Sequence, residues 1–174
     1  MSRLFTELMA VHASLAGREN FSSLLVGQCA SLGKDYISSI AATLLTLGGT
    51  HGPTEQTVNF LLQSSEFDAK VYFKHGLTIP GWGSAFRKGE PDPYFDVIDS
   101  YLFEDNNYLW KRIKEYTNKI HDEGKIIYPN AACYTAAVAI TEEIPAEASA
   151  YLLIAGRLGV WTDIYLHNIT TRLP

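Results

Sequence analysis

Residues 41–52 read Ala-Ala-Thr-Leu-Leu-Thr-Leu-Gly-Gly-Thr-His-Gly, an apolar segment that ends in glycines around a histidine. The apolar residues from 37 to 47 recur at helical spacing and cover most of the helix circumference, which is typical of a helix buried on most faces. The Gly48-Gly49 pair ends that helix, because glycine is a poor helix former that leaves helical dihedrals readily. We therefore expect a buried helix over residues 37–47, followed by His51 among glycines.

Helical spacing also dominates the segments on either side. Leu24, Leu25, Gln28 and Leu32 recur at helical spacing, Gly33 is a stop signal, and Asp35 is a candidate cap for the next helix. Residues 146–167 are apolar on nearly every face. No run alternates between apolar and polar residues over the length of a strand. The sequence therefore predicts an all-α protein in which the 37–47 helix is flanked by the helices over 20–32 and 146–167.

Four further segments complete the organisation. A helix is expected to open at Gly52 or Thr54, and residues 76–93 are rich in proline and glycine, which predicts a structured loop. Apolar residues between 98 and 120 follow a period near 3.6, which indicates one long amphipathic helix or a broken pair. Residues 131–141 are a short apolar helix candidate.

Composition limits the class of protein. The chain has 174 residues, 47% of them hydrophobic and 19% charged, as in a globular protein with a substantial core, and we predict one domain over residues 1–174. No run approaches the roughly 18 apolar residues of a membrane span. The N-terminal residues lack a signal-peptide layout, which predicts a cytoplasmic location. The net charge of −5 argues against a nucleic-acid partner but leaves room for a local phosphate pocket.

Metal and nucleotide fingerprints are absent from the sequence. The five histidines have no close metal-ligand spacing, and no CxxC or HExxH motif occurs, so no metal site is predicted. The two cysteines lie in mostly apolar stretches and do not indicate a structural disulfide.

Two motifs are able to carry chemistry. A neutral imidazole at position 51, at a helix junction, can donate one hydrogen bond to an enolate oxygen; the alternative is a capping or core histidine. The segment Pro80-Gly81-Trp82-Gly83-Ser84, with Arg87 and Lys88 beyond it, offers backbone amides, an aromatic face and two cations that suit an adenine ring and phosphates. Its alternative is a proline-glycine turn with a solvated basic tip.

Together these segments resemble, in order and spacing, the active-site motifs of the citrate synthase family. Residues 44–56 look most similar to the citryl-CoA lyase branch. The resemblance covers residues 8–170 and only the C-terminal part of the family, whose members carry a long helical N-terminal portion. The matched family motifs are the helix that begins Asn-Ala-Ser-Thr (20–36), the run that ends Leu-His-Gly-Gly-Ala-Asn (41–52), Pro-Gly-Tyr-Gly-His … Arg-Lys … Asp-Pro-Arg (79–93), Asn-Val-Asp-Phe-Tyr-Ser (130–135) and the Ala-Arg-x-x-Gly-Trp-x-Ala-His helix (154–167).

The resemblance also implies roles for residues. In the family, one histidine holds the enol of the acetyl thioester, a second polarises the oxaloacetate carbonyl, and an aspartate takes the methyl proton. His51 matches the first, whereas Ser84 stands at the second and Ala132 at the aspartate. The Asp-Pro-Arg arginine that holds a substrate carboxylate falls on Tyr94.

Further residues are implied as binding residues, and the resemblance divides the chain. Residues 52–145 are similar to the family's small domain, and residues 8–51 and 146–174 are similar to helices of its large domain. The implied substrate-binding residues are His12, Arg157 and Arg172, and the implied CoA-binding residues are Ile79, Pro80, Gly81, Trp82, Gly83, Arg87 and Lys88.

These replacements make weak or absent catalysis the expectation. A positioned general base typically contributes 10²–10⁴-fold, and an oxyanion-type donor contributes about 10²–10³-fold. Glu55 is a candidate replacement base, but an acid in the first turn of a helix is typical in any case. We expect CoA or acetyl-CoA as a ligand, no covalent cofactor, and a homodimer or higher oligomer. The alternatives are a non-catalytic interaction module and one subunit of a split enzyme whose partner supplies the N-terminal portion.

Overall fold

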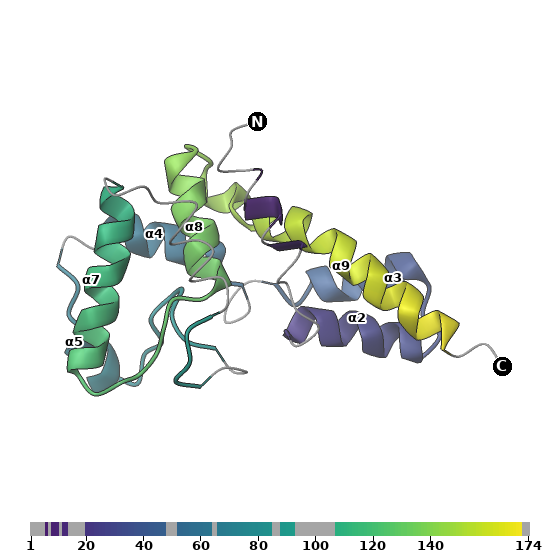
Figure 1. The fold of residues 1–174 in the computed structure, drawn as a ribbon, viewed down its shortest axis with the longest axis horizontal. Coiled ribbons are helices and arrows are strands. Elements are labelled where there is room, and N and C mark those ends of the chain that lie inside the picture. The colour runs from purple at the N-terminus through teal and green to yellow at the C-terminus, as the bar shows by residue number, and fades with distance from the viewer. Residues whose placement is uncertain are drawn as a thin grey trace.

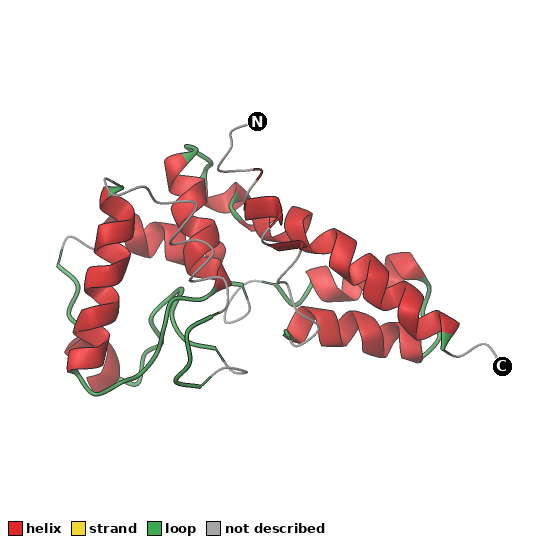
Figure 2. Ribbon diagram, viewed as in Figure 1, coloured by secondary structure: helices red, strands yellow, loops and turns green. Residues whose placement is uncertain are grey.

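The computed structural model describes residues 6, 8–10, 12–13, 20–47, 52–63, 66–84, 88–92 and 107–171. Within these ranges the only β pairing is an isolated bridge between Trp82 and Pro129, which confirms the all-α prediction (Figure 2). The described helices are α2 (Phe21–Ser31), α3 (Tyr36–Leu44), α4 (Thr54–Gln63), α5 (Ala69–Lys74), α7 (Tyr108–Asp122), α8 (Ala131–Thr141), the short 3₁₀ helix η1 (Ala146–Ala148) and α9 (Ala150–Thr170).

Polar side chains define where several helices begin. The Asp35 carboxylate accepts a hydrogen bond from Ser38 N at 2.9 Å, so Asp35 caps α3 as the sequence predicted. The Asn130 amide oxygen caps α8 by accepting from the backbone N–H groups of Ala132 and Cys133. Gly33 follows α2 with a φ of 78°, a left-handed conformation that suits the end of a helix.

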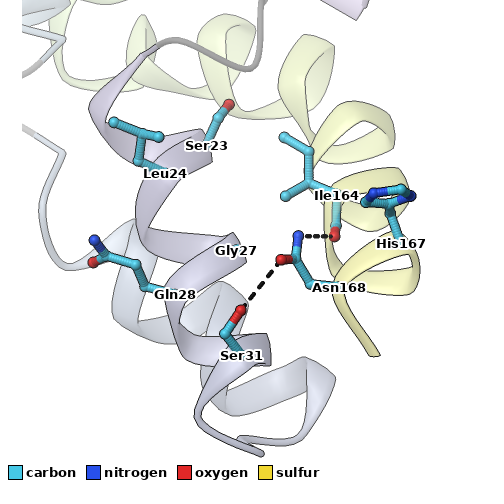
Figure 3. Close-up of a pocket in the computed structure, with 8 residues that line it drawn as sticks. All are labelled: Ser23, Leu24, Gly27, Gln28, Ser31, Ile164, His167 and Asn168. Carbon is cyan, nitrogen blue, oxygen red and sulfur yellow. Dashed lines mark hydrogen bonds between the residues drawn. The ribbon is translucent and has the colours of Figure 1, made fainter. Parts of the chain in front are cut away.

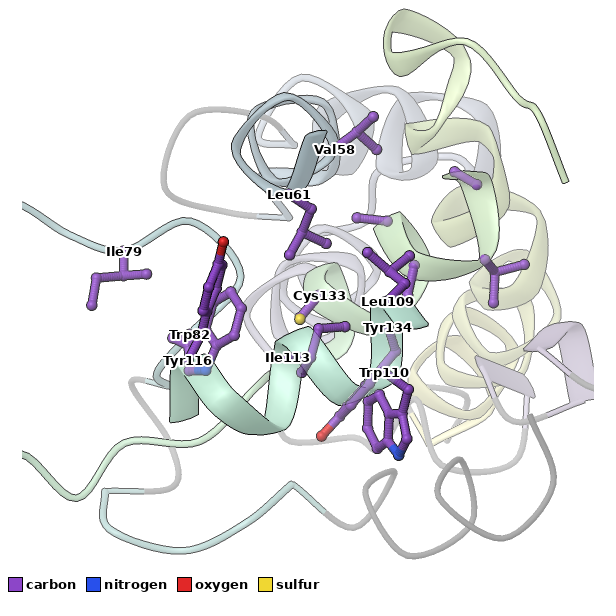
Figure 4. Packing of buried hydrophobic residues seen from close by; sticks show 14 of the residues in the cluster. Val58, Leu61, Ile79, Trp82, Leu109, Trp110, Ile113, Tyr116, Cys133 and Tyr134 are labelled. Atoms are coloured by element: carbon purple, nitrogen blue, oxygen red, sulfur yellow. The ribbon is translucent and has the colours of Figure 1, made fainter. Parts of the chain in front are cut away.

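A first core lies between α4, α7 and α8 (Figure 4). Every residue of α8 from Ala132 to Ala139 is buried, and the alanines among them let neighbouring helices approach closely. Leu61 of α4, Ile113 of α7 and Tyr134 of α8 are fully buried in this cluster. Leu152 of α9 also belongs to it, so the N-terminal turn of α9 joins this core to the rest of the molecule.

A second, smaller core lies between α2, α3 and α9. Figure 1 shows these three helices side by side at one end of an elongated molecule, with α4, α5, α7 and α8 at the other end. Val26, Ile40, Trp161 and Ile164 form the buried cluster. α9 is the long helix that reaches both cores.

The prediction that the 37–47 helix is buried on most faces is wrong for the single chain, although its neighbours are α2 and α9 as expected. Ile37 is 72% exposed and Leu45, just after α3, is 87% exposed. The reason is that α3 packs through one side, where Ser39, Ile40 and Thr43 are buried and Tyr36 contacts Tyr165 of α9. α9 likewise leaves an apolar stripe in solvent, formed by Tyr151, Leu158 and Leu166.

Two other expectations are settled in part. α4 begins at Thr54, and α8 has the bounds that the sequence predicted. The amphipathic helix expected between 98 and 120 is observed as α7 from Tyr108, and residues 98–106 lie outside the described residues. Within the part of the chain that the structure describes, no helix combines the length and apolarity needed to cross a membrane.

Candidate functional site

The Pro80-Gly81-Trp82 loop is attached to the segment that leads into α8. The Asn130 backbone N–H donates to Gly81 O at 2.9 Å, Gly83 N donates to Tyr128 O at 2.8 Å, and the Asn130 side-chain amide donates to Gly83 O at 2.7 Å. Gly81 has a φ of +87°, and a Cβ there would lie 2.5 Å from Thr57 Cγ2 and 3.1 Å from Cys133 Cβ. Glycine at position 81 therefore allows the loop to lie directly on α4 and α8.

Ala132 lies in the first turn of α8, where the resemblance puts the family's aspartate. It is 3% exposed, and its backbone N–H donates to the Asn130 side chain at 2.9 Å. A methyl group accepts no proton, so the backbone geometry of a capped helix start is present without the carboxylate. Ser84, at the place of the second family histidine, is half-buried at the end of the loop.

The expectation that Trp82 offers an aromatic face to a ligand is wrong. Trp82 is 7% exposed, and its indole Nε1 donates to Thr117 Oγ1 at 3.0 Å. Its ring centroid lies 5.9 Å from that of Phe60 and 6.2 Å from that of Tyr116. The indole therefore completes the first core, because there it finds both aromatic neighbours and an acceptor for its N–H.

The other residues of the loop differ in exposure. Ile79 is 4% exposed and belongs to the first core, whereas Pro80 and Gly83 are half-buried and Lys88 is exposed. Arg87, the second cation of the expected CoA site, lies outside the described residues, as do His51, Tyr94 and Arg172. The CoA-binding assignment of this loop stays a prediction.

A buried polar cluster brings together two residues that the sequence placed 145 positions apart, His12 and Arg157. His12 is 1% exposed, and its Nε2 lies 2.9 Å from Thr135 Oγ1 of α8. Arg157 of α9 is 9% exposed, and its Nη1 donates to Ser22 Oγ of α2 at 3.5 Å. Three helices and the His12 segment therefore meet at one polar point between the two cores.

The electrostatics of this cluster keep the imidazole neutral. Burial, and secondly the positive charge of Arg157, lower the pKa of His12 from 6.5 to about 3. A neutral imidazole beside a buried guanidinium is a local environment of positive charge, because arginine stays protonated. Sequence reasoning missed Ser22 and Thr135, although both lie inside the segments that carry the resemblance.

Two further points from the sequence concern Glu55 and metal binding. Glu55 is exposed in the first turn of α4, as expected of a helix-start acid. Among the described residues no group of three or more histidine, cysteine, aspartate or glutamate side chains gathers as a metal site would require.

A separate cavity of about 330 Å³ lies in the groove between α2 and α9 (Figure 3). Gly27 brings the helices together there, since a Cβ at this position would lie 3.3 Å from the Asn168 side chain. Ser31 Oγ donates to Asn168 Oδ1 across the groove at 3.2 Å. The lining residues are Ser23, Leu24, Gly27, Gln28, Ser31, Ile164, His167 and Asn168.

Comparison with known proteins agrees with the all-α fold. The profile of the citrate synthase C-terminal domain matches residues 1–169. No curated protein sequence gives a significant match. Among solved structures, citryl-CoA lyase from Hydrogenobacter thermophilus superposes with a TM-score of 0.76 at 23% identity, over 100% of this chain and 73% of that one. Citrate synthase from Thermotoga maritima gives a TM-score of 0.75 at 21% identity, over 94% of this chain and 47% of its own.

A third solved structure is the D541A mutant of Methanosaeta concilii ATP citrate lyase in complex with (3S)-citryl-CoA. It gives a TM-score of 0.79 at 18% identity, over 97% of this chain and 31% of its own. The chain thus spans about half of the citrate synthase and a third of the ATP citrate lyase. These identities establish a shared fold, and the profile match extends over nearly the whole chain. The chain belongs to the citrate synthase family.

Proposed function

We propose that this chain binds a CoA thioester and a short carboxylic acid of the oxaloacetate or citrate type, with weak or no turnover at the C–C bond of citryl-CoA. The observation that carries the proposal is the buried cluster of His12, Thr135, Ser22 and Arg157. A guanidinium has the planar geometry of donors that matches a carboxylate, and a low-exposure site strengthens that interaction.

The absence of a carboxylate at Ala132 supports the weak-turnover part of the proposal. The capped start of α8 is retained, but position 132 has a buried methyl group. Loss of a general base alone costs about 10²–10⁴-fold, and Ser84 in place of a histidine keeps a hydroxyl donor but loses the imidazole and its possible positive charge. Such losses are not additive, yet together they predict a rate far below an ordinary turnover number.

The CoA part of the proposal draws on the family and on one neighbour. The ATP citrate lyase mutant holds (3S)-citryl-CoA in its complex, so a protein of this fold accommodates a CoA thioester. In this chain the half-buried Pro80, Gly83 and Ser84 of the loop and the exposed Lys88 are the proposed contacts for CoA.

Isothermal titration calorimetry with CoA, acetyl-CoA, oxaloacetate and citrate tests binding directly. Arg87→Ala should weaken CoA binding by at least about tenfold, since a charge-assisted hydrogen bond contributes about 1.5–3 kcal/mol, and should weaken dephospho-CoA binding less. The matched control is Lys34→Ala, which removes a cation from the turn between α2 and α3 and should leave the affinity unchanged. Absence of heat with all four ligands at millimolar concentration would overturn the proposal.

Turnover is tested by restoring the family residues. Wild-type chain should form citrate far more slowly than the 1–10³ per second that is common among enzymes. Ala132→Asp combined with Ser84→His should raise the rate if the rest of the site is intact. A wild-type chain with an ordinary rate would contradict weak turnover and would make Glu55 the first base to test.

A second candidate, an interaction module or one subunit of a split enzyme, is favoured by a different observation. Helices α2 and α3 contain no charged residue, and Leu32, Ile37 and Leu45 are each more than 70% exposed. Such a face is unusual for a monomer and suits a second copy of the chain or a citrate synthase-like partner. Sedimentation of the purified chain separates the two cases, because only self-association gives a homodimer in the absence of a partner.

A further inference from the structure

Gly156 is a glycine in the interior of α9 with a specific neighbour. A Cβ at position 156 would overlap the Cβ of His12 and lie 3.0 Å from its Cγ and 3.2 Å from its Cδ2. Glycine in a helix interior costs roughly 1 kcal/mol relative to alanine, so its presence there calls for a packing reason. The close approach of the His12 ring to the backbone of α9 is that reason.

Thr135 decides where the His12 ring carries its proton. Thr135 Oγ1 lies 2.7 Å from the carbonyl oxygen of Ala131, one turn back along α8. Two oxygens at this distance need a hydrogen between them, so the hydroxyl proton is donated to that carbonyl. The same hydroxyl oxygen lies 2.9 Å from His12 Nε2 and can only accept there, which requires a proton on Nε2.

We propose that Gly156 and Thr135 are positioning residues for His12: Gly156 makes room for the ring against α9, and Thr135 holds it as the neutral tautomer with its proton on Nε2. The inference deepens the proposed function and rests on it only where a ligand is concerned. With Nε2–H committed to Thr135, Nδ1 carries a lone pair and no proton. The ring then has no N–H to offer a carboxylate, so the negative charge of a bound acid is held by Arg157 instead.

The ring is observed without any ligand by long-range ¹H–¹⁵N NMR of the histidine side chains, with His12→Gln to assign the signal. The wild-type His12 signal should have the neutral Nε2–H pattern and should not change between pH 5 and 8. Thr135→Val keeps the side-chain shape and should remove the tautomer preference. The matched control is Thr141→Val, whose hydroxyl makes the same bond one turn back, to Ala137 O at 2.9 Å, but is exposed and far along α8.

Gly156→Ala should move the His12 signal and make it titrate, whereas Gly159→Ala, whose added Cβ meets nothing within 4 Å, should leave it unchanged. If Gly156→Ala does not fold, comparing the His12 signal in Thr135→Val with that in Thr141→Val still tests whether Thr135 fixes the tautomer. A wild-type His12 with its proton on Nδ1, or one that keeps the Nε2–H pattern in Thr135→Val, would overturn the inference.

Ligand binding is measured separately in the folded variants. Gly156→Ala should raise the oxaloacetate dissociation constant at least about tenfold, and Gly159→Ala should change it less than about twofold. Failure of wild-type chain to bind oxaloacetate or citrate would refute the proposed function while leaving the tautomer result standing. Equal affinities in the two glycine variants would refute the positioning role of Gly156.

Discussion

Helices α7 and α3 are both surface helices, but their outward faces differ in chemistry. α7 turns Lys111, Lys114 and Glu115 to solvent and buries Ile113 and Tyr116 on the other side. α3 has no charged residue, and it turns Ile37 to solvent while Ser39 and Thr43 are buried. α7 therefore has the amphipathic pattern of a helix with one face in solvent, whereas α3 has the pattern of a helix that packs against protein on both faces.

The two hydrophobic cores also differ in how completely other parts of the chain enclose them. The first core contains side chains from α4, α7, α8 and the loop around Trp82, so each of its helices packs against more than one other element. The second core has Val26, Ile40, Trp161 and Ile164 at its centre, and large apolar side chains such as Ile37 and Leu45 remain exposed on its outer side. We infer that the first bundle is stable within one chain and that the α2–α3–α9 layer gains stability when it is covered.

The largest expected effect comes from removing the centre of the second core. Trp161→Ala should lower the free energy of unfolding by about 3–5 kcal/mol, because Trp161 is fully buried and few neighbours can fill its place. Hydrogen exchange should show lost protection in α2 and α3 and retained protection in α7 and α8. Trp110→Ala, in the first core, should show the reverse. A uniform loss of protection in both variants would contradict this difference in stability, since the two cores would then unfold as one unit.

The polar cluster between the cores should give the next largest effect, through pH. The folded-state pKa of His12 lies near 3, below the unfolded value of 6.5, so the unfolded chain binds the proton first as pH falls. The contribution is complete above pH 6.5 and is lost progressively towards pH 3, by about 2 kcal/mol between pH 6.5 and 5. Denaturant unfolding across this range measures it.

His12→Gln is the control for this pH dependence, because it removes the titrating group and should flatten the curve. The Asp35 carboxylate titrates in a lower range, since hydrogen bonds from Ser38 lower its pKa below 3.8. A loss of stability confined to pH values below 4 would therefore assign the dependence to carboxylates and not to His12.

The outward face of α3 gives a smaller effect, on assembly. If a second copy covers this face, Leu45→Lys should weaken self-association at least about tenfold, equivalent to 1.4 kcal/mol. Tyr108→Lys is the matched control, because Tyr108 is 62% exposed at the start of α7. Sedimentation velocity over a range of micromolar concentrations compares the two. A wild-type chain that remains a monomer there would remove the homodimer and leave a different partner for this face.

The sequence predicted the elements better than it predicted what surrounds them. Periodicity and a capping residue such as Asp35 are local signals, so the start of α3 and both ends of α8 agree with the sequence, although α3 ends at Leu44 and not at residue 47. Exposure is not local: the apolar circumference of residues 37–47 indicates burial, but within the described residues Ile37 and Leu45 remain largely exposed. The apolar pattern of residues 37–47 therefore fits a helix that packs against neighbours on several sides, and the described residues do not provide all of these neighbours.

In the candidate site, too, some residues were identified from the sequence and others depend on their neighbours in space. His12 and Arg157 were identified through the resemblance, and they lie in one buried cluster. Thr135 and Gly156 were not identified, because their importance depends on which atoms lie within 3 Å of them, and no sequence signal reports that. Trp82 was misjudged for a related reason: an indole among glycines in a loop suggested an exposed ring, whereas Thr117, 35 residues away, accepts its N–H in the core.

The smallest expected effect lies on α7 and sharpens the contrast with α3. Lys119 Nζ lies 2.8 Å from Glu115 Oε1 one turn away, and both side chains are largely in solvent. Exposed pairs of this kind contribute little because water and salt screen them, so Lys119→Ala should shift the melting temperature by less than about 2 °C. High salt should reduce even this difference. A larger shift, or a change in sedimentation, would mean that the charged face of α7 also contacts a partner, and the assignment of cover to the α2–α3–α9 layer alone would then be wrong.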